Sequence, residues 1–326
     1  MVELSDVLDR LHVVSLPMRV RFRGITVREV ALIDGPQGWG EFGAFLEYEP
    51  AEAAHWLASG IAAAYRPLPP TRRDRIPVNA TVPAVPAADV PDIVARFPGA
   101  RTAKVKVAEA GQSLADDVAR VNAVRALVPT VRVDANGGWT VDEAVTAAQA
   151  LTADGLLEYL EQPCRTVAEL AEVRRRIDVP IAADESIRKA SDPLHVVRSG
   201  AADVAVLKVA PLGGVAAMLD IAAAIDIPVV VSSALDSAVG IGTGLRAAGA
   251  LPELGHACGL GTGSLFVEDV AAALTPVDGY LPVTTVVPDP ARLAALTASA
   301  QRRQWWIDRV TECFPLQSTQ SGLRNR

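Results

Sequence analysis

The stretch TAKVKV, residues 102–107, is a short run of small and β-branched residues interrupted by two lysines. Successive side chains of a strand point to opposite faces, so Lys104 and Lys106 share one face. They stand where apolar strand residues would otherwise be expected. The amphipathic segment Leu114–Leu127 follows and predicts a helix. This unit of a strand and then a helix is repeated along the chain.

Candidate strands alternate with Ala-rich helical stretches from about Pro77 onward, at roughly 25-residue spacing, which predicts a (β/α) barrel. A doubly wound open sheet is the alternative, but no Gly-x-Gly-x-x-Gly turn follows the first strand. The predicted strands are Val78–Val82, Thr102–Val107, Val131–Asp134, Leu157–Glu161, Ile181–Asp184, Val204–Lys208, Pro228–Ser232 and His256–Gly261.

The N-terminal region, up to about residue 75, consists of alternating, turn-rich segments such as Thr26–Ile33 before the Asp34-Gly35 turn. This pattern predicts an antiparallel sheet followed by a helix around Glu52–Tyr65. We expect the C-terminal tail, which contains Trp305-Trp306, to pack back onto this region.

The composition argues against several classes of partner. The net charge is −7 over 326 residues and the basic residues are scattered, which argues against nucleic acid. The sequence contains no unbroken apolar run of about 18 residues, so no membrane-spanning helix is predicted. The N-terminus lacks the basic-then-apolar pattern of a signal peptide, so a cytoplasmic location is expected. Cys164, Cys258 and Cys313 are odd in number and far apart, which predicts reduced thiols.

Charged residues end five consecutive predicted strands, and barrel enzymes place catalysis at those ends. Arg132 and Asp134 share a face of one strand. Asp134, Glu161 and Asp184 come from adjacent strands, where three carboxylates would repel one another unless a cation compensated them. Hard oxygen ligands suit Mg²⁺ or Mn²⁺, so the sequence predicts a divalent-metal site.

Lysines at the other strand ends predict acid–base chemistry. Burial, a neighbouring lysine and a dication each lower the pKa of a lysine, and Lys104 lies beside Lys106. Lys208 ends a later strand. The metal would hold a substrate carboxylate and stabilise the enediolate formed when the α-proton is removed. By alternation Glu185 faces away from Asp184, so we expect it to support the site rather than bind the metal.

These residues give the sequence a resemblance to the enolase superfamily, and within it to the muconate-cycloisomerase-like group. The group has Lys-x-Lys, Asp, Glu, Asp and Lys at five consecutive strand ends. Here 28 residues separate Lys106 from Asp134, and the next intervals are 27, 23 and 24 residues. The resemblance covers the whole chain and implies an α/β fold. Its modified (β/α)₇β barrel spans residues 77–280, and an α+β capping domain spans residues 1–76, completed by 281–326.

Four segments resemble the o-succinylbenzoate synthase family in particular: Gly38–Phe42, Arg132–Trp139, Ser232–Ser237 and Gly259–Gly263. This resemblance implies a metal-dependent syn dehydration of 2-succinyl-6-hydroxy-2,4-cyclohexadiene-1-carboxylate in menaquinone biosynthesis.

The resemblance also implies roles for the lysines. Lys106 would remove the α-proton and then assist the departure of hydroxide. Lys208 would stay protonated on the opposite side, and Lys104 would tune Lys106. An N-acylamino acid racemase or a dipeptide epimerase would use the same lysines and remains the nearest alternative. A non-catalytic binding barrel is a remote one, because such proteins normally lose one of these positions.

The expected partner is a small anionic molecule, and the oligomeric state is left open. Ser232 and Ser233 could contact the succinyl arm or form loop hydrogen bonds. Arg132 could bind a carboxylate or pair with a neighbouring acid, and Asn136 is expected to support the metal site. Gly261 is a further candidate for substrate contact.

The segment Pro17–Gly24 falls where the family has a mobile lid. Arg19 and Arg21 in that segment could help to recruit an anionic substrate.

Overall fold

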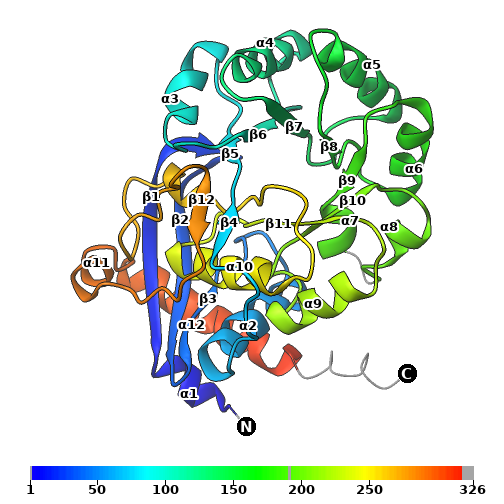
Figure 1. Cartoon of the computed structure of the whole chain (residues 1–326). Coiled ribbons are helices and arrows are strands. Elements are labelled where there is room, and N and C mark those ends of the chain that lie inside the picture. The colour runs from blue at the N-terminus through cyan, green and yellow to red at the C-terminus, as the bar shows by residue number, and fades with distance from the viewer. Residues whose placement is uncertain (1, 190–191, 318–326) are drawn as a thin grey trace.

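The computed structural model describes residues 2–189 and 192–317. A curled, seven-stranded parallel sheet forms the larger part of the molecule (Figure 1). Its order is β11-β10-β9-β8-β7-β6-β5, so each strand pairs with its neighbour in the sequence, and the predicted α/β barrel is confirmed. The strands are β5 Ala80–Val82, β6 Thr102–Lys106, β7 Thr130–Asp134, β8 Leu160–Glu161, β9 Ile181–Ala183, β10 Val204–Leu207 and β11 Val229–Val231.

The prediction of a regular eighth strand at His256–Gly261 is wrong. The segment makes two isolated parallel bridges, one between Val78 and Cys258 and one between Ser232 and Gly259. These bridges connect it to both ends of the curled sheet and close the barrel. Glycine weakens regular strand pairing. At Gly259 it is required, because a Cβ would lie 2.4 Å from the Oγ of Ser232.

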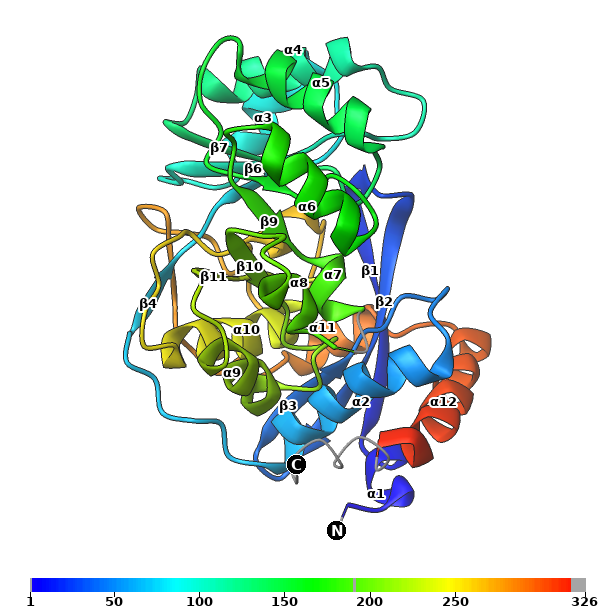
Figure 2. The ribbon, with the colours of Figure 1, turned by 90° about the vertical axis from the view of Figure 1, so that its right-hand side faces the viewer.

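Helices follow most of the strands and cover the outside of the barrel; Figure 2 shows α6 and α8 outside β9 and β10. None of the described helices is long and apolar enough to cross a bilayer. In α4, α5 and α6 the N-cap residue and the acidic residue three positions later form reciprocal hydrogen bonds, which fix where each helix begins. The helical segments are η1 Ala87–Asp89, α3 Val90–Val94, α4 Leu114–Arg125, α5 Val141–Thr152, α6 Val167–Arg176, α7 Glu185–Arg188, α8 His195–Arg198, α9 Val215–Ala223, α10 Ala238–Ala250 and η2 Thr262–Leu265.

The N-terminal region forms the predicted antiparallel sheet and helix, which we call the cap. The β1–β2 hairpin turns at Arg23 and Gly24, whose φ angles are +50° and +81°. Two positive φ angles in a two-residue turn match the twist of the flanking strands. The elements of the cap are α1 Leu4–Leu8, β1 Leu11–Phe22, β2 Ile25–Gly35, β3 Gly38–Phe42 and α2 Pro50–Tyr65.

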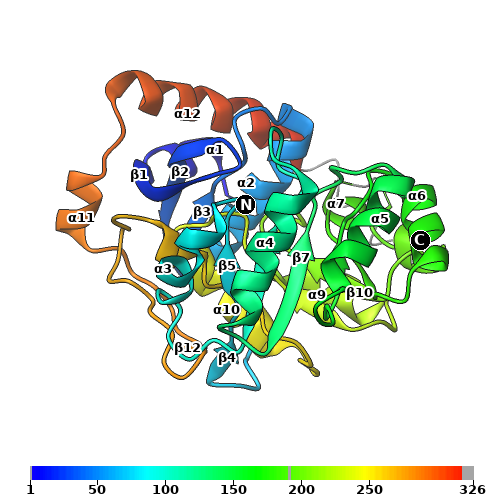
Figure 3. The ribbon, with the colours of Figure 1, turned by 90° about the horizontal axis from the view of Figure 1, so that it is seen from above.

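The C-terminal tail returns to the cap, as predicted. After α11, Pro290–Ala295, helix α12, Ala300–Cys313, contacts α2 and β1 and runs along the cap (Figure 3). Trp306 is fully buried, with its ring edge-to-face against Phe42 at 5.3 Å. Its indole N–H donates a hydrogen bond to Glu29. The parts of the predicted capping domain at residue 1 and at residues 318–326 lie outside the described residues.

A two-stranded sheet joins the two parts of the chain: β4, Arg75–Pro77, pairs with β12, Tyr280–Pro282. The predicted domain boundaries, 76/77 and 280/281, both fall inside this pair of strands. These boundaries therefore stay a prediction.

Candidate active site

A pocket of about 800 Å³ opens at the carboxyl ends of the barrel strands, under the tip of the β1–β2 hairpin. Side chains from both the cap and the barrel line it. The cap contributes Phe22, Arg23, Phe45 and Tyr48, among others. The barrel contributes Thr81, Lys104, Lys106, Asn136, Glu185, Arg188, Lys208, Ser232, Ser233 and Thr262. Because the strands are parallel, their carboxyl ends, which carry the charged residues, all lie at the mouth of the barrel.

Strand register places the predicted carboxylates side by side. Lys106 of β6 pairs with Asp134 of β7, which pairs with Glu161 of β8. Glu161 in turn pairs with Ala182, so Asp184 follows two residues further along the next strand. The three carboxylate residues are fully buried from solvent. Buried carboxylates need compensation by cations or hydrogen bonds.

Each carboxylate is compensated by a lysine. The Nζ of Lys106 donates hydrogen bonds to Asp134 and, at 2.9 Å, to Asn136. The Nζ of Lys104 lies 3.1 Å from Glu161 and 3.5 Å from Asp134. Four predicted residues therefore meet in one charged cluster with Asn136: Lys104, Lys106, Asp134 and Glu161.

Lys208 compensates Asp184 from the other side of the barrel, at 2.5 Å. It follows β10, whereas Lys106 ends β6, and three strands of the sheet separate β6 from β10. The two lysines therefore face the pocket from opposite walls, which is the arrangement that two-sided acid–base chemistry on one bound molecule requires.

The lysines have different protonation behaviour. Burial lowers the pKa of Lys106 to about 8 against the attraction of Asp134, and the positive charges of Arg23 and Lys104 also act to lower it. Burial also acts to lower the pKa of Lys104, but Glu161 and Asp134 outweigh it and the pKa is raised. Lys106 is thus the lysine better suited to lose and regain a proton near neutral pH.

The carboxylates fit a hard divalent cation by donor type and by charge. Burial and the neighbouring Asp134 raise the pKa of Glu161 to about 7, so a further positive charge close to Glu161 would favour its ionised form. No three acidic, His or Cys side chains in the described ranges are drawn together as a ligand shell. The reason is local: the ammonium group of Lys104 lies between Glu161 and Asp134. Binding a metal ion would require that ammonium group to move aside.

Asn136 and Glu185 connect the two walls of the pocket. The side chain of Asn136 accepts a hydrogen bond from Lys106 and donates one to Glu185 at 3.2 Å. Glu185 begins helix α7 and is not a strand residue, so the alternation argument for its direction does not apply. Within the described part of the chain it forms no hydrogen bond or ion pair with Asp134 or Glu161, and its partners are Asn136 and Arg188.

The two serines differ. Ser233 donates a hydrogen bond to the carbonyl of Gly259 at 2.9 Å and shares one with Thr262 at 2.7 Å. It therefore has the loop-bonding role that the sequence left open. Ser232 lines the pocket, and its hydroxyl forms no hydrogen bond with another described residue, so it is available to a ligand.

Arg132 does not line the pocket. It lies one layer below the mouth, where its Nε donates to Glu158 at 2.7 Å and its Nη1 donates to the hydroxyl of Tyr159 at 2.9 Å. Alternation predicted the correct face of the strand for this residue but not its depth. The pairing with an acid, one of the two possibilities for Arg132, is the one observed.

Three further predicted contacts also lie outside the pocket. Gly261 packs against Phe97, whose ring a Cβ would approach to 3.0 Å. Arg19 lines a separate cavity, and Arg21 is exposed on the hairpin. The hairpin reaches the pocket instead with its tip, at Arg23, and the Arg23-Gly24 turn was the signal for that position.

Arg188 was missed from the sequence. It donates hydrogen bonds to Asp184 at 3.0 Å, to Glu185 at 2.7 Å and to the hydroxyl of Tyr48 at 2.9 Å. The signal was its position four residues after Asp184, a spacing that brings side chains together on one helical face. Arg188 thereby ties the cap to the barrel at the pocket wall.

Comparison with known proteins places the chain in a family. Residues 13–64 match the enolase N-terminal domain-like family and residues 92–288 the enolase C-terminal domain-like family. Over 319 residues the chain is 77% identical to the o-succinylbenzoate synthase of Mycobacterium marinum, and the match covers 98% of each chain. The chain belongs to the o-succinylbenzoate synthase family. The family's protein from Mycobacterium leprae is 74% identical over 325 residues, covering 98% of this chain and 97% of that one.

Solved structures extend the similarity of the fold to other enolase-like proteins. A muconate lactonizing enzyme from Pseudomonas fluorescens, complexed with muconolactone, superposes with a TM-score of 0.75 at 24% identity, covering 89% of this chain and 98% of that one. The L-Ala-D/L-Glu epimerase from Bacillus subtilis gives 0.70 at 22% identity, covering 85% and 96%. These two likenesses show the fold alone. Proteins of the enolase superfamily generally depend on a divalent metal, which agrees with the donor set described above.

Proposed function

We propose that the chain dehydrates 2-succinyl-6-hydroxy-2,4-cyclohexadiene-1-carboxylate to 2-succinylbenzoate, as a step of menaquinone biosynthesis. The observation that carries the proposal is the 77% identity over nearly the whole length of an o-succinylbenzoate synthase. The complete set of lysines and carboxylates at the mouth of the barrel supports it.

Lys106 acts first as the base. Its lowered pKa gives a useful fraction of neutral amine near pH 8, and this amine takes the proton α to the ring carboxylate. The same Nζ then returns the proton to the leaving hydroxyl group on the same face of the ring. The C–O bond breaks, water leaves, and the ring gains the double bond that makes it aromatic.

Lys208 contributes a fixed positive charge from the opposite wall. Its ammonium group offsets the negative charge that develops on the substrate carboxylate after proton removal. Its ion pair with Asp184 and the contact of Arg188 with the same carboxylate hold the Nζ in place. Lys104 supports the base, because its positive charge contributes to lowering the pKa of Lys106.

Asp134, Glu161 and Asp184 would hold Mg²⁺, with Mn²⁺ as a possible substitute. Bound there, the metal would supply Lewis-acid polarisation of the substrate carboxylate and so make the α-proton more acidic. The three carboxylates would orient the substrate toward Lys106. The succinyl arm would extend toward Ser232.

A coupled assay tests the proposal. Purified protein is treated with EDTA and supplied with the cyclohexadiene substrate generated in place, and substrate loss is followed in the ultraviolet. We expect turnover only after Mg²⁺ is added. A protein that leaves this substrate unchanged but exchanges the α-proton of N-succinylamino acids in deuterated water would instead be a racemase, the alternative that both lysines permit. A protein that does neither would be the non-catalytic barrel.

A further inference from the structure

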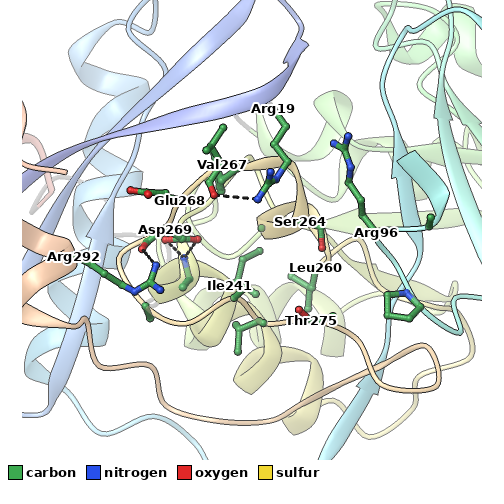
Figure 4. Close-up of a pocket in the computed structure, with 18 residues that line it drawn as sticks. Arg19, Arg96, Ile241, Leu260, Ser264, Val267, Glu268, Asp269, Thr275 and Arg292 are labelled. Atoms are coloured by element: carbon green, nitrogen blue, oxygen red, sulfur yellow. Dashed lines mark hydrogen bonds between the residues drawn. The ribbon is translucent and has the colours of Figure 1, made fainter. Parts of the chain in front are cut away.

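A second cavity, of about 540 Å³, lies behind the active-site pocket. It opens to solvent and is bounded by β1, the segment after α3, α10, the η2 turn, the segment that follows η2, and α11. Three arginines from distant parts of the chain, Arg19, Arg96 and Arg292, contribute to its wall (Figure 4). No residue lines both this cavity and the active-site pocket.

None of these three arginines forms an ion pair with another described residue. Arg19 donates only to the backbone carbonyl of Val267, at 3.1 Å. Arg292 donates weakly to the carbonyl of Asp269, at 3.4 Å. The guanidinium of Arg96 has no hydrogen-bond or ion-pair partner within residues 2–189 and 192–317, and its Nη1 is buried. Arg19 and Arg292 are exposed, whereas Arg96 is half-buried. A buried guanidinium N–H, such as that at Nη1 of Arg96, normally has an anionic or carbonyl partner.

Among the described residues, the two acidic side chains of the cavity, Glu268 and Asp269, form no ion pair with its arginines. Both carboxylate oxygens of Asp269 accept hydrogen bonds from the backbone N–H of Ala238, and one also accepts the N–H of Val270. Burial raises the pKa of Asp269, against the backbone hydrogen bonds and the positive charge of Arg292. Glu268 is exposed and lies beside Asp269, across the cavity from Arg96 (Figure 4).

The remaining wall is largely apolar. Ile241, Leu260, Phe266 and Leu274 contribute to it. The first three belong to the barrel core, and Leu274 packs against it. A site of a few hundred Å³ with an apolar wall and a few polar groups is typical of small-molecule binding. A cationic side and an apolar side together select a ligand that has both an anionic group and an apolar body.

We propose that this cavity binds a small organic acid with an apolar ring, whose carboxylate contacts Arg19 and Arg96. The ring packs against Leu260 and Phe266. Inorganic phosphate lacks the apolar body and fits the cavity less well. The η2 turn separates the two cavities, since Thr262 faces the active-site pocket while Gly263 and Ser264 face the second cavity. The site is therefore distinct from the one that holds the substrate.

Calorimetric titration with benzoate tests the proposal in a protein whose active-site lysines are removed, Lys106→Ala with Lys208→Ala. In this background we expect benzoate binding to persist. Adding Arg96→Met keeps the apolar stem and removes the charge-assisted hydrogen bonds. It should therefore raise the dissociation constant for benzoate about tenfold. The matched control is Arg303→Met, an exposed arginine on α12 that lines neither cavity, and it should leave binding unchanged.

Three results would overturn the proposal. One is the loss of benzoate binding when the active-site lysines alone are removed, because the ligand would then occupy the active site. Another is equal affinity for benzoate with and without Arg96→Met and Arg19→Met. The third is binding of inorganic phosphate without binding of benzoate. Arg96→Met in the wild-type background should keep dehydratase activity, which shows that the variant is folded and separates this proposal from the proposed function.

Discussion

Two rows of charged side chains lie inside the barrel, one above the other, and they differ in what their charges do. The mouth row consists of Lys104, Lys106, Asp134, Glu161, Asp184 and Lys208. The lower row consists of Arg132, Glu158, Tyr159 and His256. Both rows are built from strand residues and their neighbours, and both contain close ion pairs.

The lower row is closed. Arg132 is fully buried and bonds to Glu158 and Tyr159, and His256 lies 3.0 Å from the same Glu158. The mouth row lines an 800 Å³ pocket, and its members have opposing pKa shifts. Buried charge inside a barrel is therefore not by itself a sign of function. Access to a pocket and pKa values shifted toward neutral pH distinguish the mouth row.

The largest contrast is expected from Lys208→Ala. Removing a charge that stabilises a developing anion costs about 10²–10³-fold in kcat. The free energy of unfolding should change little, because Arg188 still compensates Asp184 at 3.0 Å. The matched control is Lys189→Ala, which removes a lysine at the pocket edge that is 42% exposed. The coupled assay measures kcat, and urea unfolding measures the free energy of unfolding. Equal kcat in the two variants would contradict a catalytic role for the mouth row.

Arg132→Met should have the opposite profile. Breaking a buried ion pair costs about 3 kcal/mol of unfolding free energy, at the low end of the usual range because Glu158 is 22% exposed. The kcat should stay close to that of the wild type, because Arg132 does not line the pocket. In the exposed pair of Arg174 with Asp203, Arg174→Met should cost less than about 1 kcal/mol. A loss of kcat larger than the loss of stability would place Arg132 in the active site after all.

The smallest effect concerns acid pH. Burial acts to raise the pKa of Glu158, but His256 and Arg132 outweigh it, so the pKa lies below its ordinary value of 4.5. A lowered folded pKa contributes stability above the unfolded value, and this contribution is lost as the pH falls through the folded pKa. The stability difference between the wild type and Arg132→Met should therefore narrow as the pH drops below about 4.5. A difference that stays constant from neutral to acid pH would contradict this pairing.

The sequence was sufficient to predict the mouth row because two simple rules apply there. Parallel strands bring their carboxyl ends to one edge, and alternation decides which residues face inward. Lys106, Asp134 and Glu161 satisfy both rules and occupy one register row. No property of a distant segment was needed to place them.

The two rules gave less information about how deep in the barrel a side chain lies, and about positions that depend on a segment distant in the sequence. Alternation cannot separate Arg132 from Asp134, which face the same way two residues apart. The position of Arg23 depends on how the cap lies over the barrel, and the hairpin tip alone reaches the pocket. The last segment of the barrel is held by isolated bridges because Gly259 must approach Ser232 closely, which no strand pattern records.

The most direct test of the account is the kcat of Lys106→Ala in the Mg²⁺-dependent assay, measured together with its free energy of unfolding. General acid–base catalysis by a positioned side chain contributes about 10²–10⁴-fold. We predict a fall in kcat of about 10³-fold in a protein that remains folded. A folded Lys106→Ala protein that retained more than about a tenth of the wild-type kcat would contradict the assignment of Lys106 as the group that moves the proton.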